Sequence, residues 1–396
     1  MSALGDLRVI EMGQLVAGPF CGQLLADFGA DVIKVETPVD GDPMREWGRE
    51  KSDGASLWWP VIARGKKSIT LNLRTPRGQE LARQLIDTAD IVIENFRPGT
   101  LEKWGMDPEV LMARNPRLIV VRVSGYGQDG PYSQRPGYGA IGEAMGGLRA
   151  VIGEPDRPPA RAGISLGDTL AATFACVGAL AALHRRETTG TGQVVDAALY
   201  EAVLNVMESL VPEYALTGYI RPRTGSILPN VSPANAYPTL DGKEHLISGN
   251  QDTVWRRLAT AMNRPDLGDD PRFATHSARG LNQADLDAII ADWTRTVTAA
   301  DLELVLNEHS VPNGKIFTAA DMLIDQHFHA RKAIVSMLHP KLGEFPMANV
   351  SPKLSESPGE IRWVGPELGE HTHDVLGAVC GLTDAQIDEL RAAGIV

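Results

Sequence analysis

The sequence predicts an α/β protein whose strands form a largely parallel sheet. Short β-type runs alternate with segments that carry apolar residues at helical spacing, and this repetition is typical of strand–helix–strand crossover units. The chain has 396 residues, which is long for one ordinary domain, so we expect two domains or one large domain with an insertion. Apolar residues make up 43% of the chain and charged residues 22%, a composition typical of soluble globular proteins.

The alternation runs through the first half of the chain. Strands are predicted over 8–11, 31–36, 68–73, 90–94, 118–124 and 193–197, and helices over 19–28, 77–88, 168–186 and from 200 onward. The stretch 125–163 is rich in Gly and Pro and is expected to be mostly loop.

A second Pro- and Gly-rich stretch predicts the boundary between domains. We place a large domain at 1–220, a linker at 221–238, a small α/β domain at 239–320 and a return segment at 321–396.

The charge balance excludes some classes of partner. The formal net charge is −12, whereas a protein that binds nucleic acid or an anionic membrane surface needs a basic face. The start, MSALGDLRVIEM, has no basic segment and no long apolar core, and no apolar run approaches the length of a membrane span. We therefore expect a cytoplasmic protein without nucleic-acid or membrane partners.

Metal and nucleophile motifs are missing from the sequence. Its three cysteines are far apart, and it has neither HExxH nor a GxSxG elbow. It also lacks GxGxxG, so nothing favours a dinucleotide. We expect no metal site and no permanently bound cofactor.

Asp168 begins a strongly helical run in ISLGDTLAA. One interpretation is an N-cap, because an aspartate carboxylate accepts hydrogen bonds from the free N–H groups of a helix start. The other is a carboxylate nucleophile, because the same N–H groups stabilise negative charge that develops on an attacked acyl oxygen. The residues alone leave both interpretations open.

Two further features are compatible with a phosphate-bearing ligand. Residues 45–103 carry eleven basic and eight acidic side chains, a local charge of +3, which is either a solvated face or a polyphosphate site. The segments Val16–Pro19 and Asn95–Gly99 each follow a predicted strand, where ligands bind in open parallel sheets.

Taken together, these segments resemble the class III CoA transferases, the family of formyl-CoA transferase, carnitine CoA transferase and alpha-methylacyl-CoA racemase. The resemblance covers nearly the whole chain. It is carried by LRVIEMGQLVAGPFCGQLLADFGADVIKVETPVDGDPMR, NLRTPRGQELARQLIDTADIVIENFRPGTLEKWG, SGYGQDGPYSQRPGY, GISLGDTLAATFACVGALAAL and GEHTHDVL.

The resemblance implies a Rossmann-like large domain built from both chain ends, a smaller inserted domain, and an interlaced homodimer. It implies Asp168 as the catalytic residue, which forms a covalent aspartyl-CoA thioester. Coenzyme A contacts are implied for Val16, Ala17, Leu71, Arg74, Asn95, Phe96, Arg97 and Lys103 or its neighbours. Substrate contacts are implied for Gln14, Arg45, Tyr138, Gly249 and Asn250.

The closest implied activity is transfer of coenzyme A between small dicarboxylic acids, with succinyl-CoA as donor, or within one acid. Arg45 or Arg161 could pair with a distal carboxylate, although arginines are usually surface residues. Transferases of the family often have an acidic residue after the aromatic at 138, where this chain has Gly139.

Two alternatives stay open. A racemase of the family would carry histidine at 138, where this chain has a tyrosine, whose phenol is a poor base at neutral pH. A non-catalytic CoA-binding partner subunit is the third hypothesis.

Overall fold

The computed structural model describes residues 2–52 and 54–396, which form two compact units. Unit 1 is made of Met1–Leu148, Ala162–Gly218 and His329–Val396, and therefore contains both chain ends, as predicted. Unit 2 is made of Arg149–Arg161 and Tyr219–Phe328. It extends beyond the small domain predicted at 239–320 on both sides.

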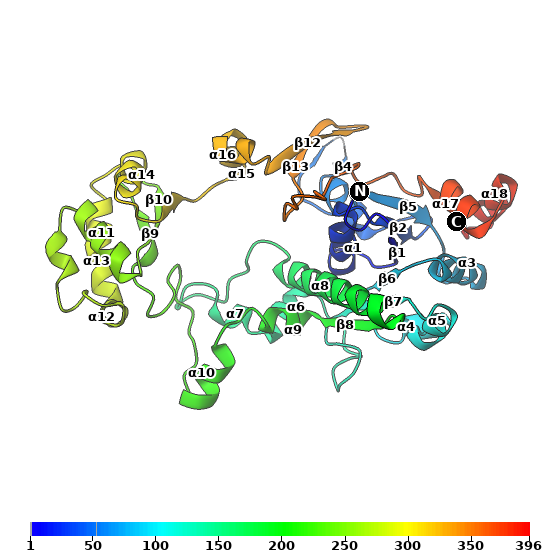
Figure 1. Cartoon of the computed structure of the whole chain (residues 1–396), viewed down its shortest axis with the longest axis horizontal. Helices are drawn as coiled ribbons and strands as arrows, with labels where there is room; N and C mark the ends of the chain where they lie inside the picture. Colours follow the sequence, from blue (N-terminus) through cyan, green and yellow to red (C-terminus); the bar gives the residue numbers. More distant parts are fainter. Residues whose placement is uncertain (1, 53) are drawn as a thin grey trace. The chain divides into compact units, whose positions relative to one another are not determined.

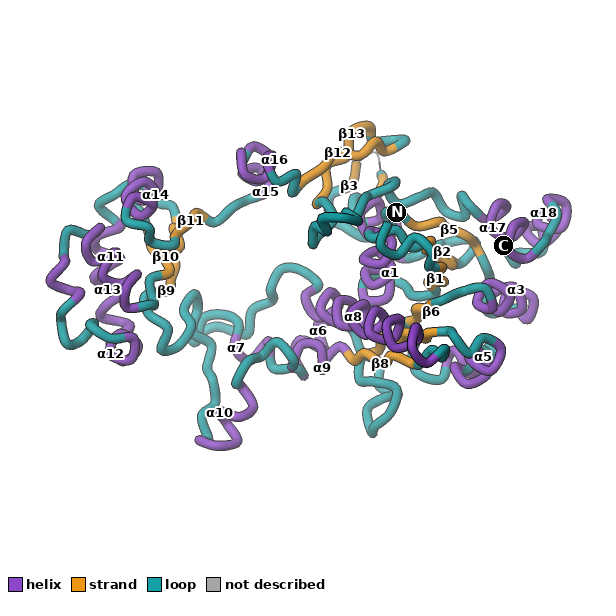
Figure 2. The backbone as a smooth tube through the Cα atoms, viewed as in Figure 1, coloured by secondary structure: helices purple, strands orange, loops and turns teal. Residues whose placement is uncertain are grey.

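A six-stranded parallel sheet forms the centre of unit 1 (Figures 1 and 2). Its strands are β1 (Arg8–Glu11), β2 (Asp31–Glu36), β5 (Lys66–Thr70), β6 (Ile91–Glu94), β7 (Ile119–Ser124) and β8 (Val194–Ala198). They lie in the order β5-β2-β1-β6-β7-β8, and every neighbouring pair is parallel. The predicted α/β class with a parallel sheet is confirmed.

Both faces of this sheet are covered by helices, because successive strand residues point to opposite sides. Val9 packs with α1 (Ala17–Asp27) and α8 (Leu166–Thr189), whereas its neighbour Ile10 packs on the other face. The helices of that second face are α3 (Pro76–Asp87), α5 (Pro108–Arg114), α17 (Thr372–Cys380) and α18 (Asp384–Ala392). The C-terminal helices thus complete a core that the N-terminal strands begin.

The strand order places a topological switch point between β1 and β6. From β1 the chain continues through β2 to the edge strand β5, then returns to β6 on the other side of β1. Loops that leave the carboxyl ends of these two neighbouring strands diverge and open a crevice, which is where open α/β sheets bind ligands.

One sequence prediction about unit 1 is confirmed with an addition, and one needs correction. The stretch 125–163 is mostly loop, as predicted, but it also contains two short helices, α6 (Gly139–Met145) and α7 (Leu148–Val151), the second of which runs into unit 2. The run GAIGEAM is short and rich in small residues, so its helical pattern is hidden by the surrounding Gly and Pro. The strand predicted at 68–73 runs instead over 66–70, because the buried Lys66 and the half-buried Lys67 at its start are poor apolar signals.

Shorter elements complete unit 1. They are η1 (Pro43–Arg45), β3 (Lys51–Ser52), β4 (Ala55–Ser56), α2 (Trp59–Ile62), α4 (Thr100–Lys103), α9 (Leu199–Leu204), α10 (Leu210–Thr217), β12 (Ile334–His339) and β13 (Gly343–Ala348). Strands β12 and β13 form an antiparallel hairpin.

Unit 2 has an antiparallel sheet and its own core around Tyr237, Trp255 and Phe273. Its strands are β9 (Ala234–Pro238), β10 (Glu244–Ser248) and β11 (Asn313–Lys315). Its helices are α11 (Asp252–Ala261), η2 (Pro265–Gly268), α12 (His276–Leu281), α13 (Gln283–Thr294), α14 (Ala299–Glu308) and α15 (Ala319–Ile324), and α16 (Gln326–Ala330) crosses its end.

Among the described residues, α8 alone is long and apolar enough to meet the criterion for a membrane-spanning helix. Its alanine-rich side, which includes Ala171, Ala175 and Ala179, is buried against α1 and the sheet. The small side chains let the two helices approach closely, so α8 has the packing of a core helix of unit 1.

Candidate active site

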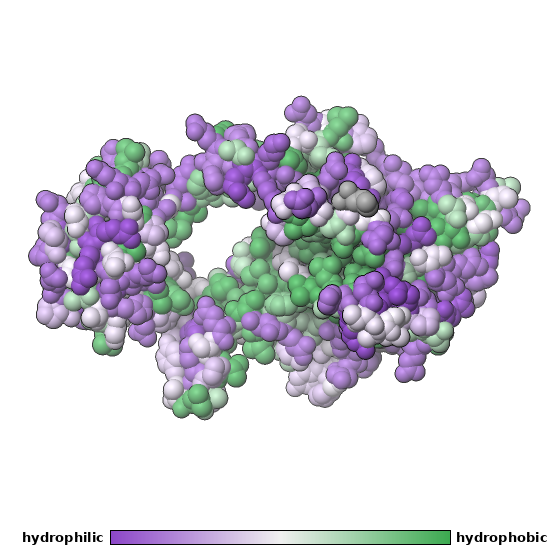
Figure 3. All heavy atoms as spheres, viewed as in Figure 1, coloured by the Kyte–Doolittle hydropathy of each residue, from purple (hydrophilic) through white to green (hydrophobic). Residues whose placement is uncertain are grey.

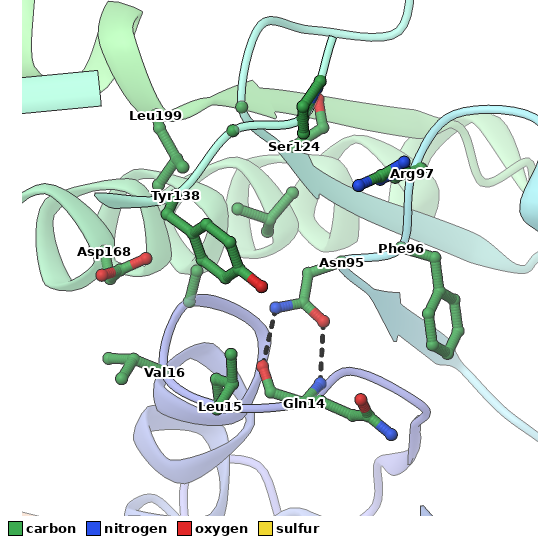
Figure 4. Close-up of a pocket in the computed structure, with 15 residues that line it drawn as sticks. Gln14, Leu15, Val16, Asn95, Phe96, Arg97, Ser124, Tyr138, Asp168 and Leu199 are labelled. Atoms are coloured by element: carbon green, nitrogen blue, oxygen red, sulfur yellow. Dashed lines mark hydrogen bonds between the residues drawn. The ribbon is translucent and has the colours of Figure 1, made fainter. Parts of the chain in front are cut away.

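A cavity of about 200 Å³ opens at the switch point, at the carboxyl ends of β1, β6 and β7 (Figure 4). Strand ends, the start of α1, the loop before α6 and the start of α8 all contribute to it. Its lining residues are Gln14, Leu15, Val16, Ala17, Asn95, Phe96, Arg97, Val123, Ser124, Gly125, Pro136, Gly137, Tyr138, Asp168 and Leu199. All of them belong to unit 1.

Asn95 and Gln14 join the two loops that diverge at the switch point. The Gln14 N–H donates to Asn95 Oδ1 at 2.8 Å, and Asn95 Nδ2 donates to the Gln14 carbonyl at 2.8 Å (Figure 4). A side-chain amide thus pairs with a backbone amide, as one strand pairs with another. A Cβ at Gly13 would lie 2.9 Å from Asn95 Oδ1, so glycine is needed there for this approach.

Glu94, the last residue of β6, holds the loop that follows this strand. Its Oε2 accepts the Phe96 N–H at 2.8 Å, and its Oε1 accepts from Arg122 Nε at 2.7 Å. Burial raises the pKa of Glu94, and the Arg122 guanidinium opposes that rise. Arg122 also reaches Glu102 at 2.9 Å, so one buried arginine connects β6, β7 and α4.

Asp168 lies in the first turn of α8, two residues after its first residue, Leu166. The N-cap residue is Ser165, whose side chain makes no capping hydrogen bond. The Gly167 N–H instead donates to Oε1 of Glu143, a buried residue of α6, at 3.3 Å. The sequence interpretation of Asp168 as the N-cap residue is therefore wrong, and its carboxylate lines the cavity at the positive end of the helix.

The helix α6 shapes the space around this carboxylate. A Cβ at Gly139 would lie 2.1 Å from Asp168 Oδ2, so the absence of a side chain at 139 leaves room for Asp168. The preceding residue, Tyr138, is 68% exposed and lines the cavity. The loop that carries Tyr138 passes close to the backbone just after β7. Both residues at this contact are glycines, because a Cβ at Gly125 would lie 2.9 Å from Gly137 Cα.

Seven of the predicted contact residues line this cavity together with Asp168. They are Gln14, Val16, Ala17, Asn95, Phe96, Arg97 and Tyr138. Three others do not line it, namely Leu71 after β5, Arg74 before α3, and Lys103 at the end of α4. Gly249 and Asn250 belong to unit 2, after β10.

Arg45 has other partners than a ligand in this structure. Its Nε and Nη2 each donate to Glu36 at 2.8 Å, its Nη1 donates to the Pro366 carbonyl at 3.2 Å, and its guanidinium lies 3.7 Å from the Trp59 ring centroid. Arg45 does not line the cavity.

Several lining residues were not expected from the sequence. Ser124 is the last residue of β7 and Gly125 follows it, so the rule that pointed to the ends of β1 and β6 would also have found them. Glu143, which does not line the cavity but accepts the Gly167 N–H, was not predicted because its segment was interpreted as loop.

A larger, apolar cavity of about 570 Å³ also lies in unit 1, and Val16 belongs to the lining of both cavities. Its walls are mainly hydrophobic and include Phe20, Leu24 and Trp58. We place the candidate site in the smaller cavity, because strand ends, a helix N-terminus and several polar groups converge there.

Comparison with known proteins gives the same family as the sequence. Residues 4–372 match the model of CoA-transferase family III. The chain is 58% identical over 393 residues to succinyl-CoA–D-citramalate CoA-transferase of Chloroflexus aurantiacus, covering 99% of this chain and 98% of the relative. It is 42% identical to the beta subunit of succinyl-CoA–L-malate CoA-transferase of the same organism, covering 99% and 98%. The crystal structure of a CAIB/BAIF family protein from Brucella suis has a TM-score of 0.84, 35% identity, and coverage of 96% and 99%.

Proposed function

The chain belongs to CoA-transferase family III, and we propose that it transfers coenzyme A from succinyl-CoA to a small dicarboxylic acid through a covalent intermediate on Asp168. The observation that carries the proposal is the position of the Asp168 carboxylate, in the first turn of α8 and facing the switch-point cavity. The names of the relatives support the donor and the acceptor class, because they act on succinyl-CoA with citramalate or malate.

The reaction balances without water, metal or ATP. An oxygen of Asp168 attacks the thioester carbonyl and the C–S bond breaks, which releases coenzyme A as a thiolate and leaves a succinyl–aspartyl anhydride. The thiolate then attacks the aspartyl carbonyl, which releases succinate and leaves an aspartyl-CoA thioester. The acceptor carboxylate attacks that thioester and the C–S bond breaks, which releases the thiolate and leaves an acceptor–aspartyl anhydride. The thiolate then attacks the acceptor's carbonyl in this anhydride, which forms the new acyl-CoA and regenerates the Asp168 carboxylate.

The start of α8 supplies the electrostatic assistance. N–H groups of the first helical turn have no partner within the helix, so they favour negative charge at this end. Each attack on a carbonyl develops such a charge, and stabilising it there lowers the barrier. Because Glu143 already accepts the Gly167 N–H, Asp168 is not required to cap the helix.

The size of the cavity limits which part of the donor it holds. A volume of about 200 Å³ accommodates the thioester end and not a whole coenzyme A molecule. We infer that the pantetheine passes between Val16 and Asn95 and that Arg97, which is exposed at the mouth, faces phosphate.

We also propose that the protein is an interlaced homodimer. Apolar side chains are exposed on α8, where Val177 is 57% exposed, and on α10, where Leu216 is 84% exposed. Figure 3 shows hydrophobic residues gathered on the face of unit 1 to which α8 belongs. A partner would remove this surface from water. Sedimentation velocity should give the mass of two chains, and a single-chain mass would contradict the homodimer.

The test offers the wild type and Asp168→Asn succinyl-CoA with citramalate, malate, glutarate or mesaconate, and measures new acyl-CoA masses. We expect one or more new thioesters from the wild type and a loss of at least about a thousandfold in kcat for Asp168→Asn. Asp301→Asn is the matched control, because Asp301 occupies the same position in the first turn of α14 and is not a cavity residue.

Trapping separates the mechanism from the activity. Hydroxylamine added during turnover should convert Asp168 to a hydroxamate that peptide mass spectrometry locates. Transfer without an adduct on Asp168 would contradict the covalent mechanism. Exchange of the proton alpha to the thioester, without transfer, would instead support a racemase.

A further inference from the structure

Leu15 has an unusual backbone conformation for its residue type. It lies between β1 and α1, lines the active-site cavity, and has a φ of 64°, in the left-handed region. A residue with a Cβ pays a steric penalty there, so the conformation persists only if the surroundings hold it. Leu15 lies between Gln14 and Val16, two of the residues proposed to contact coenzyme A, and it therefore sets their relative direction.

Asp42 holds the backbone of Leu15 through a hydrogen bond. Its Oδ1 accepts the Leu15 N–H at 3.1 Å and the Met44 N–H at 2.9 Å. The residue is 1% exposed. The Asp42 carboxylate thus reaches the strained residue from the loop after β2, 27 positions along the chain.

A buried lysine holds Asp42 in turn. Lys34 Nζ lies 2.8 Å from Asp42 Oδ2 and 3.0 Å from Glu11 Oε1, and it donates to the Gly13 carbonyl at 2.7 Å. The second oxygen of Glu11 lies 2.7 Å from Lys66 Nζ. One ionic cluster therefore holds the backbone on both sides of Gln14, at the Gly13 carbonyl and at the Leu15 N–H.

The charges of Asp42 and Lys34 stabilise each other. Burial works to raise the pKa of Asp42, but Lys34 lowers it below its usual value. Burial likewise works to lower the pKa of Lys34, and the carboxylates of Asp42, Glu11 and Glu36 raise it instead. An ionised, immobile carboxylate is a strong acceptor for a backbone N–H.

We propose that Asp42 is a positioning residue that keeps Leu15 left-handed and so holds Gln14 and Val16 in the shape that binds coenzyme A. The identity of the ligand rests on the proposed function. The assignment of Asp42 to the left-handed conformation of Leu15 rests on the contacts of Asp42 and does not depend on the ligand. Without that acceptor the loop relaxes from its strained conformation, and the apparent affinity falls with the fraction of molecules that keep the binding shape.

A double-mutant cycle tests this assignment. Glycine adopts a φ of 64° without the Cβ penalty, so Leu15→Gly should remove the need for Asp42. We expect Asp42→Ala to weaken coenzyme A binding about tenfold, measured by isothermal titration calorimetry with coenzyme A itself. In the Leu15→Gly background the same change should weaken binding less than about threefold.

Glu94→Ala is the matched control. Glu94 is also buried, is also paired with a cation, and also accepts a backbone N–H of a cavity loop. Since Glu94 holds the loop after β6 and not the loop of Leu15, Leu15→Gly should not reduce the effect of Glu94→Ala. The assignment would be overturned if Asp42→Ala weakened binding equally in the wild-type and Leu15→Gly backgrounds. It would also be overturned if Leu15→Gly reduced the effects of Asp42→Ala and Glu94→Ala equally.

Asp42→Asn covers the case in which Asp42→Ala does not fold. The amide keeps an oxygen for the Leu15 and Met44 N–H groups but loses the charge opposite Lys34. We expect a lower melting temperature with coenzyme A affinity within about threefold of the wild type. A folded Asp42→Asn protein that loses affinity tenfold would contradict the positioning role.

Hydrogen exchange separates this proposal from the proposed function. Peptides that cover 13–18 should exchange faster in Asp42→Ala than the same peptides in Glu94→Ala. The increase should be smaller in Asp42→Asn, because its amide keeps an acceptor for the Leu15 N–H. Faster exchange without coenzyme A binding by the wild type would leave the loop assignment standing and overturn the ligand. Unchanged exchange in a folded Asp42→Ala protein would overturn the loop assignment, and if that variant does not fold, the coenzyme A affinity of Asp42→Asn decides.

Discussion

The floor of the cavity and its rim are built in different ways. We call the floor the backbone of Gln14, Leu15, Asn95 and Phe96, and the rim the side chains of Arg97 and Tyr138. The backbone N–H groups of Gln14, Leu15 and Phe96 each donate to a buried or half-buried side chain, which is Asn95, Asp42 and Glu94 respectively. The rim side chains are exposed, and within residues 2–52 and 54–396 neither has a hydrogen-bond or ion-pair partner.

This difference separates holding a shape from contacting a ligand. Buried cations such as Lys34 and Arg122 are paired with carboxylates within the protein, so their charges are not available to a substrate. The rim side chains have kept their hydrogen-bonding capacity for whatever enters. Changes to the floor should therefore alter stability and binding together, whereas changes to the rim should alter binding alone.

Apart from replacement of Asp168 itself, the largest effect is expected at Gly139, which lies outside the floor and beside the proposed nucleophile. Gly139→Ala places a Cβ at a point 2.1 Å from Asp168 Oδ2 and forces that carboxylate away. A displacement of about 1 Å can cost about a hundredfold in rate, so we expect kcat to fall about a hundredfold. Affinity for coenzyme A should stay within about threefold, because the floor loops are untouched.

Gly314→Ala is the control for Gly139→Ala. Gly314 lies in β11 of unit 2, and a Cβ there meets nothing within 4 Å. Steady-state kinetics and calorimetry on both variants give the comparison. An unchanged kcat for Gly139→Ala would show that Asp168 reacts from a different rotamer.

The next effect is expected from Asn95→Ala, which removes both hydrogen bonds between the two floor loops. Each bond contributes about 1 kcal/mol, so the free energy of unfolding should fall by about 2 kcal/mol. Coenzyme A affinity should fall about tenfold, because Gln14 and Asn95 would no longer be held together.

Asn115→Ala is the matched control for Asn95→Ala. Asn115 also bonds the backbone twice, through Nδ2 to the Ala89 carbonyl at 2.9 Å and through Oδ1 from the Arg117 N–H at 3.1 Å, but it does not line the cavity. Urea unfolding should show a similar loss of stability in both variants. A similar loss of affinity in both would break the distinction between a floor residue and a structural one.

Much of the fold could be predicted from the sequence because the strands of a parallel sheet are buried on both faces. Runs such as Asp31–Glu36 and Ile119–Ser124 are short and rich in β-branched residues, and the structure confirms both strands to within one residue. The helices around them end at turn residues that the sequence displays, such as Gly190 after α8.

The part of the site that could be predicted consists of residues next to strand ends. Asn95 follows β6 directly, so its place at the crevice depends on local position alone. Glu143 and Asp42 could not be found in this way, because their roles depend on contacts with Gly167 and Leu15 that are 24 and 27 positions distant. A buried polar side chain has no sequence pattern of its own.

The smallest effect is expected at the rim, from Arg97→Ala. The side chain is exposed and has no partner within the described residues, so its loss should leave the melting temperature unchanged. If the guanidinium faces a phosphate, KM for succinyl-CoA should rise about threefold to tenfold with little change in kcat. The difference between variant and wild type should shrink as salt is added, because an exposed charge pair is screened. Arg264→Ala, which removes an exposed arginine of unit 2 that pairs with Asp266, should change neither KM nor its salt dependence. A fall in stability of Arg97→Ala equal to that of Asn95→Ala would mean that Arg97 belongs to the floor, and that floor and rim are not separate in this site.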